Sequence, residues 1–520
     1  MSGATEVPEM SVHTMNPAMP LTSYDLAPYP RLSHYFCQPA RAATLARLWG
    51  LTPPPVERCR VLEVGCASGG NLIPLAVAFP ESAFVGVDAS GRQVLEGRED
   101  IARLGLKNVT LHAMSLEAID AAFGKFDYIL AHGLYSWVPA PVRDRLMAIC
   151  SENLTEPGVA YISYNTYPGW HSMEALRRMM LYYVRQATEP AERAAKALDL
   201  LDFLASTADP ADHYGVMLNW YNNLLRHAPS AGAYVLHEHL EEVNEPVYFH
   251  EFAEHAARYN LQYLGDADFR MEFMTTLPKA KVEALWAMSH NLIELGQHMD
   301  FVRNRMFRQT LLVHAQMPVS RRLDAARLHT LWVSSSARPE SREIELGPGA
   351  TEVFNGRDGS KLSTDHPLSK AAMVCLIQCW PAQLAFDALV AEAQTTLAEA
   401  TGQPPAASGD LEQIEVLAAN LLQAFACSES LVQFYPCAPR FSLEAGPRPR
   451  ASPWARLEAE AGADVTNLRH ERINLDPLQR QLLRRLDGTR DRTALLDEFE
   501  PPVLKAKLDE LARSALLLQP

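Results

Sequence analysis

Several features are scarce in this 520-residue sequence, and each scarcity narrows what the protein can be. The eight cysteines are scattered and form no C-x-x-C pair, which favours reduced, buried thiols in a cytosolic protein. No apolar run approaches the length of a membrane span, so membrane insertion is not expected. Basic residues are fewer than acidic ones, which gives a formal net charge of −15. This negative charge argues against nucleic acid as a partner.

The start of the sequence lacks a charged region followed by an apolar stretch, so a signal peptide is not expected. We therefore expect a cytoplasmic protein. Composition is otherwise ordinary for a globular protein, at 48% hydrophobic and 21% charged residues. The length exceeds that of one ordinary domain and predicts about three.

A strand, a glycine-rich turn and a helix are predicted within CRVLEVGCASGGNLIP, the stretch from Cys59 to Pro74. The short apolar run 60–64 contains β-branched residues, the turn spans 65–70, and a helical pattern follows. This order is typical of the nucleotide-binding half of a doubly wound sheet. The spacing E-x-G-x-x-x-G differs from the G-x-G-x-x-G of dinucleotide enzymes, and there is no phosphate loop of the form G-x-x-x-x-G-K-[ST].

Two acidic residues narrow the choice of ligand. Glu63 lies inside the predicted strand, where a carboxylate is unfavourable unless it meets a cation or several donors. Asp88 ends the next apolar run, 23 residues after Gly65, close to the spacing of a group that binds ribose hydroxyls. S-adenosylmethionine (AdoMet) combines an amino-acid ammonium with a ribose and has no phosphates. The stretch resembles motif I of class I AdoMet-dependent methyltransferases, and GVDAS (86–90) resembles motif II; a similar turn for another nucleotide is the alternative.

The predicted fold class is α/β, with a Rossmann-like class I methyltransferase sheet, a helical insertion and winged-helix-like α+β modules at the C-terminal end. Helical segments alternate with the strands, and ligands bind such sheets at the carboxyl ends of the strands. The strands are predicted at Arg60–Val64, Ala83–Val87, Val109–Ala113, Phe126–Ala131, Gly158–Tyr164, Leu261–Phe273 and Phe307–His314.

Longer stretches carry a more specific resemblance. HGLYSWVP (132–139), GVAYISYNTYPGW (158–170) and YVLHEHLEEVNEPVYFHEF (234–252) resemble the rickettsial-type protein lysine methyltransferases. In that family a methyltransferase regulatory domain follows the catalytic domain. The similar motifs occur in order from Tyr24 to about Thr310 and continue more weakly to the C-terminal end.

The resemblance implies a set of AdoMet-binding residues along the carboxyl edge of the sheet. At the position after the third strand the family commonly uses an acidic residue against adenine, whereas this sequence has Ser115. The segment that contains Tyr24 is expected either to fold over the cofactor cleft or to be an ordinary packing arm. The expected AdoMet-binding residues are Tyr24, Glu63, Gly65, Cys66, Ala67, Gly69, Asn71, Asp88, Ala89, Ser90, Gln93, Ser115, Leu116 and His132.

Aromatic residues gather in the two loops after the fourth and fifth strands. Aromatic walls exclude water, lower the pKa of a lysine amine and tolerate its cation. We therefore expect them to line the substrate site, with His132 and Tyr164 as candidates to bind or accept the departing proton; a core histidine is an equal alternative for His132. The expected catalytic residues are His132, Tyr135, Trp137, Tyr164, Tyr167 and Trp170.

A metal site is not expected. The string His237-Glu238-His239 has the spacing H-E-H, which differs from the H-E-x-x-H that places two histidines on one helical face. A lid or a structural element is the preferred interpretation of this string. The family resemblance adds a substrate-positioning role for Glu238 or Asn244 as an open alternative.

Composition and pattern changes divide the chain into seven expected segments. The expected segments are a disordered tail (1–20), N-terminal lid helices (21–55), the AdoMet-binding core (56–172), a helical insertion or lid (173–257), the last two strands of the core (258–319), a regulatory winged-helix-like domain (320–400) and a C-terminal helical or winged-helix-like domain (411–520).

The sequence as a whole predicts an AdoMet-dependent methyltransferase that acts on the lysine amine of a protein. Two alternatives stay open: a methyltransferase for a small molecule or peptide natural product, and a regulatory protein that binds AdoMet without turnover. The expected partner is a protein or peptide substrate, with a small molecule as the alternative. The oligomeric state is open, a homodimer included.

Overall fold

A seven-stranded sheet forms the centre of the protein, which we describe from a computed structural model covering residues 23–26, 28–226, 231–275, 277–402 and 411–519. The strand order is β3-β2-β1-β4-β5-β7-β6, and only β7 runs antiparallel to its neighbours. This is the sheet of class I methyltransferases, so the predicted fold class is confirmed. The strands are β1 (Arg60–Val64), β2 (Ala83–Asp88), β3 (Val109–Ala113), β4 (Phe126–Ala131), β5 (Leu154–Asn165), β6 (Leu261–Asp266) and β7 (Phe307–His314).

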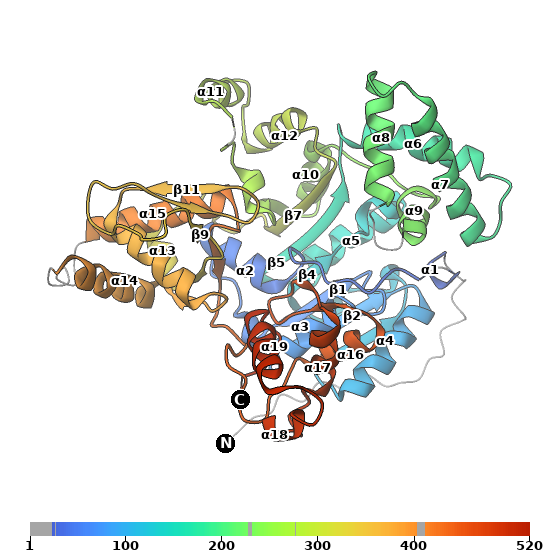
Figure 1. Ribbon diagram of the computed structural model, residues 1–520. Helices are drawn as coiled ribbons and strands as arrows, with labels where there is room; N and C mark the ends of the chain where they lie inside the picture. Colours follow the sequence, from blue (N-terminus) through green and yellow to red (C-terminus); the bar gives the residue numbers. More distant parts are fainter. Residues whose placement is uncertain (1–22, 27, 227–230, 276, 403–410, 520) are drawn as a thin grey trace.

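Helices cover both faces of this sheet, as Figure 1 shows. Local capping explains where they begin and end: the Ser90 side chain accepts from the N–H of Gln93 at the start of α4, and Gly105 ends the helix with a left-handed φ of 66°. The two sheet faces pack into separate apolar clusters. The covering helices are α2 (Pro39–Leu48), α3 (Leu72–Ala78), α4 (Gly91–Leu104), α5 (Ala140–Glu152), α10 (Phe249–Arg258) and α12 (Leu292–Arg303), and α11 (Lys279–Ala287) packs against α12.

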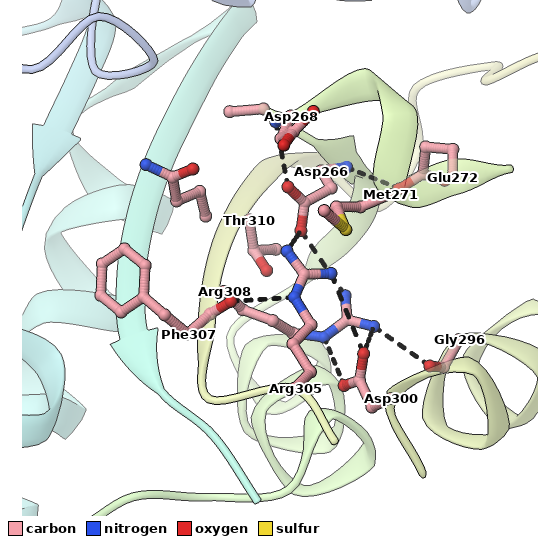
Figure 2. A network of polar contacts seen from close by, with 12 residues as sticks. Asp266, Asp268, Met271, Glu272, Gly296, Asp300, Arg305, Phe307, Arg308 and Thr310 are labelled. Carbon is pink, nitrogen blue, oxygen red and sulfur yellow. Dashed lines mark hydrogen bonds and ion pairs between the residues drawn. The ribbon is translucent and has the colours of Figure 1, made fainter. Parts of the chain in front are cut away.

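The strand predicted at Leu261–Phe273 is too long, and β6 ends at Asp266. A short turn of 3₁₀ helix follows, because the Asp268 carboxylate accepts from the N–H of Arg270 and caps it. Figure 2 shows the buried ion network beside this turn. Arg305 binds Asp266 at 2.5 Å, and Arg308 binds Asp300 at 2.7 and 2.9 Å.

A helical lobe is inserted between β5 and β6. It has its own apolar core, and Figure 1 shows its four helices together at one end of the molecule in teal and green. Leu176 and Met180 of its first helix are buried in this core, while Tyr183 is exposed. The helices are α6 (Trp170–Tyr183), α7 (Pro190–Thr207), α8 (His213–Arg226) and α9 (Ala231–His239).

A middle module follows the sheet. It begins with a 3₁₀ helix over Ala325–Thr330, capped by the Asp324 side chain, and the strand Trp332–Ser334 follows. Strand β13, which comes after the boundary expected at 400–411, pairs antiparallel with β8. The elements are β8 (Trp332–Ser334), β9 (Arg338–Pro339), β10 (Glu352–Asn355), β11 (Lys361–Thr364), α13 (Pro367–Cys379), β12 (Leu384–Ala385), α14 (Phe386–Thr401), α15 (Leu411–Cys427) and β13 (Gln433–Tyr435).

The last part of the chain forms a small domain with its own apolar core, drawn in red in Figure 1 against the blue helices α3 and α4. An ion pair of 2.8 Å joins Arg103 of α4 to Glu460 of α16. Its elements are α16 (Pro453–Ala461), the hairpin β14 (Asp464–Thr466) and β15 (Arg472–Asn474), α17 (Pro477–Arg485), α18 (Arg492–Leu495) and α19 (Pro501–Arg513).

Two further observations concern the whole described chain. No helix within the described ranges has both the length and the apolarity needed to cross a membrane. The tail expected to be disordered, 1–20, lies outside the described residues.

Candidate active site

A cavity of about 910 Å³ opens at the carboxyl edge of the sheet, between the strand ends and the helical lobe. The sheet brings together at this cavity most of the residues that the sequence analysis selected. The selected residues that line it are Tyr24, Glu63, Gly65, Cys66, Ala67, Asn71, Asp88, Ala89, Ser90, Gln93, Ser115, Leu116, His132, Trp137 and Trp170.

The turn after β1 is held in a conformation that suits glycine. Gly65 has a φ of 74° and Gly69 one of 77°, the region that L side chains rarely adopt. Gly69 itself does not line the cavity, because it faces Ile73 and Leu111 behind the turn. At Gly70 a Cβ would lie 2.9 Å from the backbone nitrogen of Leu32, so only glycine admits the N-terminal segment this close.

Glu63 is buried at the floor of the cavity, with 3% of its surface exposed. One carboxylate oxygen, Oε1, accepts from the Asn71 amide at 2.9 Å, while Oε2 is buried without a partner among the described residues. Burial raises the pKa of the Glu63 carboxyl to about 8, against the opposing effect of the Asn71 hydrogen bond. A buried acceptor with one oxygen unpaired is a binding site for a cation.

Asp88 fixes the two loops beside Glu63. Its carboxylate accepts from the backbone N–H of Ala67 at 2.8 Å and from that of Ser90 at 2.7 Å. Burial raises the pKa of Asp88, and these hydrogen bonds oppose the rise. The short helix α1 (Ser23–Leu26) closes over this point, because Ser90 Oγ donates to Asp25 at 2.6 Å.

The far end of the cavity carries Gln93, whose side-chain oxygen is buried without a partner among the described residues. Ser115 donates to Glu117, and both line the cavity. Glu117 therefore supplies an acidic group two residues after the position where the family resemblance predicts one, which the sequence analysis missed.

Two histidine rings stack where the loop after β4 borders the cavity. The centroids of His34 and His132 are 3.7 Å apart, and Phe307 meets the His132 ring edge-on at 5.9 Å. Tyr161 Oη lies 2.9 Å from Nδ1 of His132 and also accepts from the Gln309 amide at 3.0 Å. Burial lowers the pKa of His34 to about 4 and that of His132 well below its ordinary value, so both rings are neutral near pH 7.

Three families of domains match this chain. Residues 61–158 match the family described as "Methyltransferase domain", and residues 231–314 match "Predicted methyltransferase regulatory domain". Residues 447–514 match "PKMT, C-terminal winged helix domain". The regulatory match covers α9 to β7, so a regulatory role for the segment 320–400 stays a prediction.

Relatives in Rickettsia prowazekii extend the similarity over most of the chain. The protein RP789 is 35% identical over 497 residues, which cover 93% of this chain and 87% of RP789. The protein RP028 is 36% identical over 241 residues, which cover 45% of this chain and 94% of RP028. Among solved structures, PKMT2 of Rickettsia typhi is 27% identical with a TM-score of 0.81, and the match covers 95% of this chain and 100% of PKMT2. A second PKMT2 structure contains AdoHcy and matches equally well.

The chain belongs to this family of AdoMet-dependent methyltransferases. The C-terminal winged helix predicted from short helices beside a hairpin is confirmed. Within the methyltransferase the residues of the cavity fit AdoMet. The unpaired oxygen of Glu63 suits the ammonium of the methionine end, and the Asp88 carboxylate, which follows β2 as in motif II, suits the ribose hydroxyls.

Three of the aromatic residues expected at the methyltransferase site do not line the cavity. Tyr164 points to the opposite sheet face, where it stacks on Phe252 at 4.0 Å, because side chains alternate along β5 and Asn165 takes the cavity side. Tyr135 is also in that core, with its hydroxyl 2.8 Å from His255 Nδ1. Tyr167 binds Glu174 at 3.2 Å, outside the cavity lining.

The wall opposite the sheet is made by α9 and the segment after it. The His237 ring stacks on Tyr24 with centroids 4.7 Å apart, and Glu238 lines the cavity beside it. Burial raises the pKa of Glu238 to about 7. Within the described part of the chain no three His, Cys, Asp or Glu residues are arranged to hold a metal ion.

Sequence reasoning missed several lining residues that come from distant segments. His34 precedes α2, Asn165 ends β5, Met306 comes just before β7, and Phe307 begins β7 beside the network of Figure 2. Asn165 could have been found from strand alternation, since it follows two buried positions on the sheet face of Tyr161. His34 belongs to the N-terminal segment that was expected to fold over the cofactor cleft or to be a packing arm, whereas Met306 and Phe307 had no local signal, because only tertiary packing brings them to the cavity.

Proposed function

We propose that this methyltransferase transfers the methyl group of AdoMet to the side-chain amine of a lysine in a protein substrate. The observation that supports the proposal is the shared architecture with PKMT2, which extends over 95% of this chain and 100% of PKMT2 and therefore far beyond the sheet. A likeness confined to the sheet would support only methyl transfer in general, because many methyltransferases share that sheet.

The charge of the cavity supports a cationic acceptor. Among its described lining residues there are six carboxylates, namely Glu63, Asp88, Glu117, Glu238, Glu241 and Glu242, and two guanidinium groups, Arg31 and Arg193. Three of the carboxylates are on the wall opposite the sheet, away from the residues assigned to AdoMet. An acidic wall attracts a lysine side chain to the site, and the net charge of −15 favours a basic partner in the same way.

When bound, AdoMet supplies an electrophilic methyl group on a sulfonium. The chain's own residues have to bind, orient and desolvate the reactants. Of the residues that line the cavity, Glu63 would hold the ammonium, Asp88 the ribose hydroxyls, and Gln93, Ser115 and Glu117 the region expected for adenine.

In this scheme the His132 ring acts as a hydrogen-bond donor through Nε2. The Gln309 amide donates to Tyr161 Oη, which directs the phenolic hydrogen to Nδ1 of His132. The hydrogen of the neutral imidazole is then on Nε2, so that nitrogen cannot accept a proton. We infer that the acceptor amine loses its proton before transfer, with Trp137 and Trp170 providing the apolar surroundings that lower its pKa.

The test is transfer of isotopic label from AdoMet to peptides that contain one lysine, with matched peptides that have arginine at that position. We expect the purified full-length chain to add 14 mass units at lysine only, as mapped by mass spectrometry, and the variant Asp88→Ala to add none. Label found only in small metabolites would favour the natural-product alternative. AdoHcy binding without label transfer to any acceptor would favour the non-catalytic alternative.

A further inference from the structure

The hairpin of the C-terminal domain enters the core of the methyltransferase domain. Its tip, residues 467–471, is held by the Asn467 side chain, whose oxygen accepts from the N–H groups of Arg469 and Glu471, both at 2.9 Å. His470 has a φ of 63°, a conformation that is costly for a residue of this size. Only 4% of His470 is exposed, so its ring is buried between the two domains.

The buried ring of His470 reaches the motif I turn, almost 400 residues earlier in the chain. Its Nε2 lies 2.7 Å from Oδ1 of Asn71, so the ring nitrogen donates to the amide oxygen. The amide nitrogen of Asn71 donates in turn to Oε1 of Glu63 at 2.9 Å and to the carbonyl of Cys37 at 3.1 Å. A continuous chain of hydrogen bonds thus runs from the C-terminal domain to the carboxylate at the floor of the AdoMet cavity.

This chain of bonds decides which way the Asn71 amide faces. With two donors on its oxygen, from His470 and from the N–H of His34 at 3.0 Å, the amide has to present its nitrogen to Glu63. Once Glu63 is ionised, a rotated amide would place its oxygen against a carboxylate, which is repulsive in a buried site. Glu63 is thereby held with Oε2 free for the ammonium.

The same hairpin also supports the wall of the cavity. Thr466 Oγ1 lies 3.2 Å from Ser33 Oγ, and Arg472 donates to the carbonyl of Arg31 at 3.5 Å. Arg31, Leu32 and His34 line the cavity, so the hairpin contacts a lining segment from behind.

We propose that His470 is a positioning residue for the methyl donor, which it serves by orienting the Asn71 amide and through it the Glu63 carboxylate. The docked C-terminal domain is then part of the AdoMet site, and loss of its contact weakens AdoMet binding without removing any group that touches AdoMet. This role is independent of the acceptor and does not depend on the proposed lysine specificity.

The test is calorimetric binding of AdoHcy to the full-length chain, which needs no acceptor. His470→Leu removes the donor at similar volume, and His470→Gln keeps an N–H at nearly the position of Nε2. Both place a side chain without special tolerance for positive φ at the tip, so they match in backbone strain. We expect AdoHcy to bind about tenfold more weakly to His470→Leu and within about threefold of wild type to His470→Gln.

Two further measurements separate positioning from general damage. Asn474→Ala, which removes an exposed contact with Asp464 in the same hairpin, should leave AdoHcy affinity unchanged. His470→Leu and Asn71→Ala should be non-additive in AdoHcy affinity, because both act through the same amide. Unchanged affinity in His470→Leu, equal losses in the Leu and Gln variants, or additive losses with Asn71→Ala would each overturn the proposal.

Discussion

The two walls of the cavity are built in different ways. On the sheet wall, the two acidic groups lie at strand ends, Glu63 in β1 and Asp88 as the last residue of β2, and the Asp88 carboxylate accepts from the backbone N–H groups of Ala67 and Ser90. On the lobe wall, α9 is a short helix from an insertion, and its contact with Tyr24 is a ring stack between segments more than 200 residues apart. The sheet wall is therefore set mainly by backbone geometry at the strand ends, with His470 supporting Asn71 and Glu63 from behind, and the lobe wall by the packing of separate units.

The two walls therefore suit different tasks, one the binding of the methyl donor and the other the binding of the acceptor. A rigid strand edge suits a methyl donor that is the same for the whole family, whereas a wall made by an insertion can vary with the acceptor. Changes in the sheet wall should therefore lower AdoMet affinity, and changes at the lobe wall should lower turnover with little effect on AdoMet affinity.

The largest effect is expected from Asp88→Ala. The substitution removes the acceptor for two backbone N–H groups and the carboxylate assigned to the ribose, so AdoHcy affinity should fall by more than about 100-fold. Calorimetric titration with AdoHcy measures this. Asp127→Ala, a carboxylate that binds Arg60 N away from the cavity, is the matched control. An unchanged dissociation constant for Asp88→Ala would refute the assignment of the sheet wall.

Trp170→Ala is expected to have a smaller effect, and to lower turnover rather than AdoHcy affinity. Trp170 begins α6, lines the cavity and packs into the core of the lobe, so its loss opens the acceptor side to water. We expect kcat to fall about 30-fold while AdoHcy affinity changes less than threefold, with Trp170→Phe in between. Loss of AdoHcy affinity equal to the loss of turnover would show that the two walls are not separable.

The smallest effect is a pH dependence of AdoHcy affinity. The Glu63 carboxyl, with its pKa raised to about 8, is protonated at neutral pH in the free protein and must ionise to pair with the ammonium. Binding should therefore release about one proton at pH 7, and affinity should rise about tenfold from pH 6 to pH 7 and level off above pH 8. Calorimetry in buffers of different ionisation enthalpy measures the proton release, which Glu63→Gln should remove. Proton uptake or no linkage would contradict the pairing.

The sequence was sufficient for the sheet wall because its signals are local. Strand 60–64, the glycine turn and Asp88 come within 29 residues, and the predicted strand at Phe307–His314 agrees with β7 at both ends. The fold and the residues assigned to the methyl donor could therefore be predicted with little tertiary information.

The aromatic residues show where such reasoning ends. Tyr135 and Tyr164 belong to the correct loops, but strand alternation and the packing of α10 place them in the core. Glu117 and His34 lie in segments that were expected near the cavity but were not selected themselves, whereas nothing near His470 in the sequence marks it as a neighbour of the cavity. Their role depends on contacts that only the folded chain makes.

The buried ion network of Figure 2 has a consequence for anyone who would alter this enzyme's substrate range. Phe307 stands between Arg305 and Arg308, whose partners Asp266 and Asp300 are fully buried. Removal of one member of an ion pair leaves the other charge buried without a partner or water, which destabilises the protein by about 3–5 kcal/mol. Libraries directed at this edge of the cavity should randomise Phe307 alone, or exchange an arginine and its aspartate together for an apolar pair.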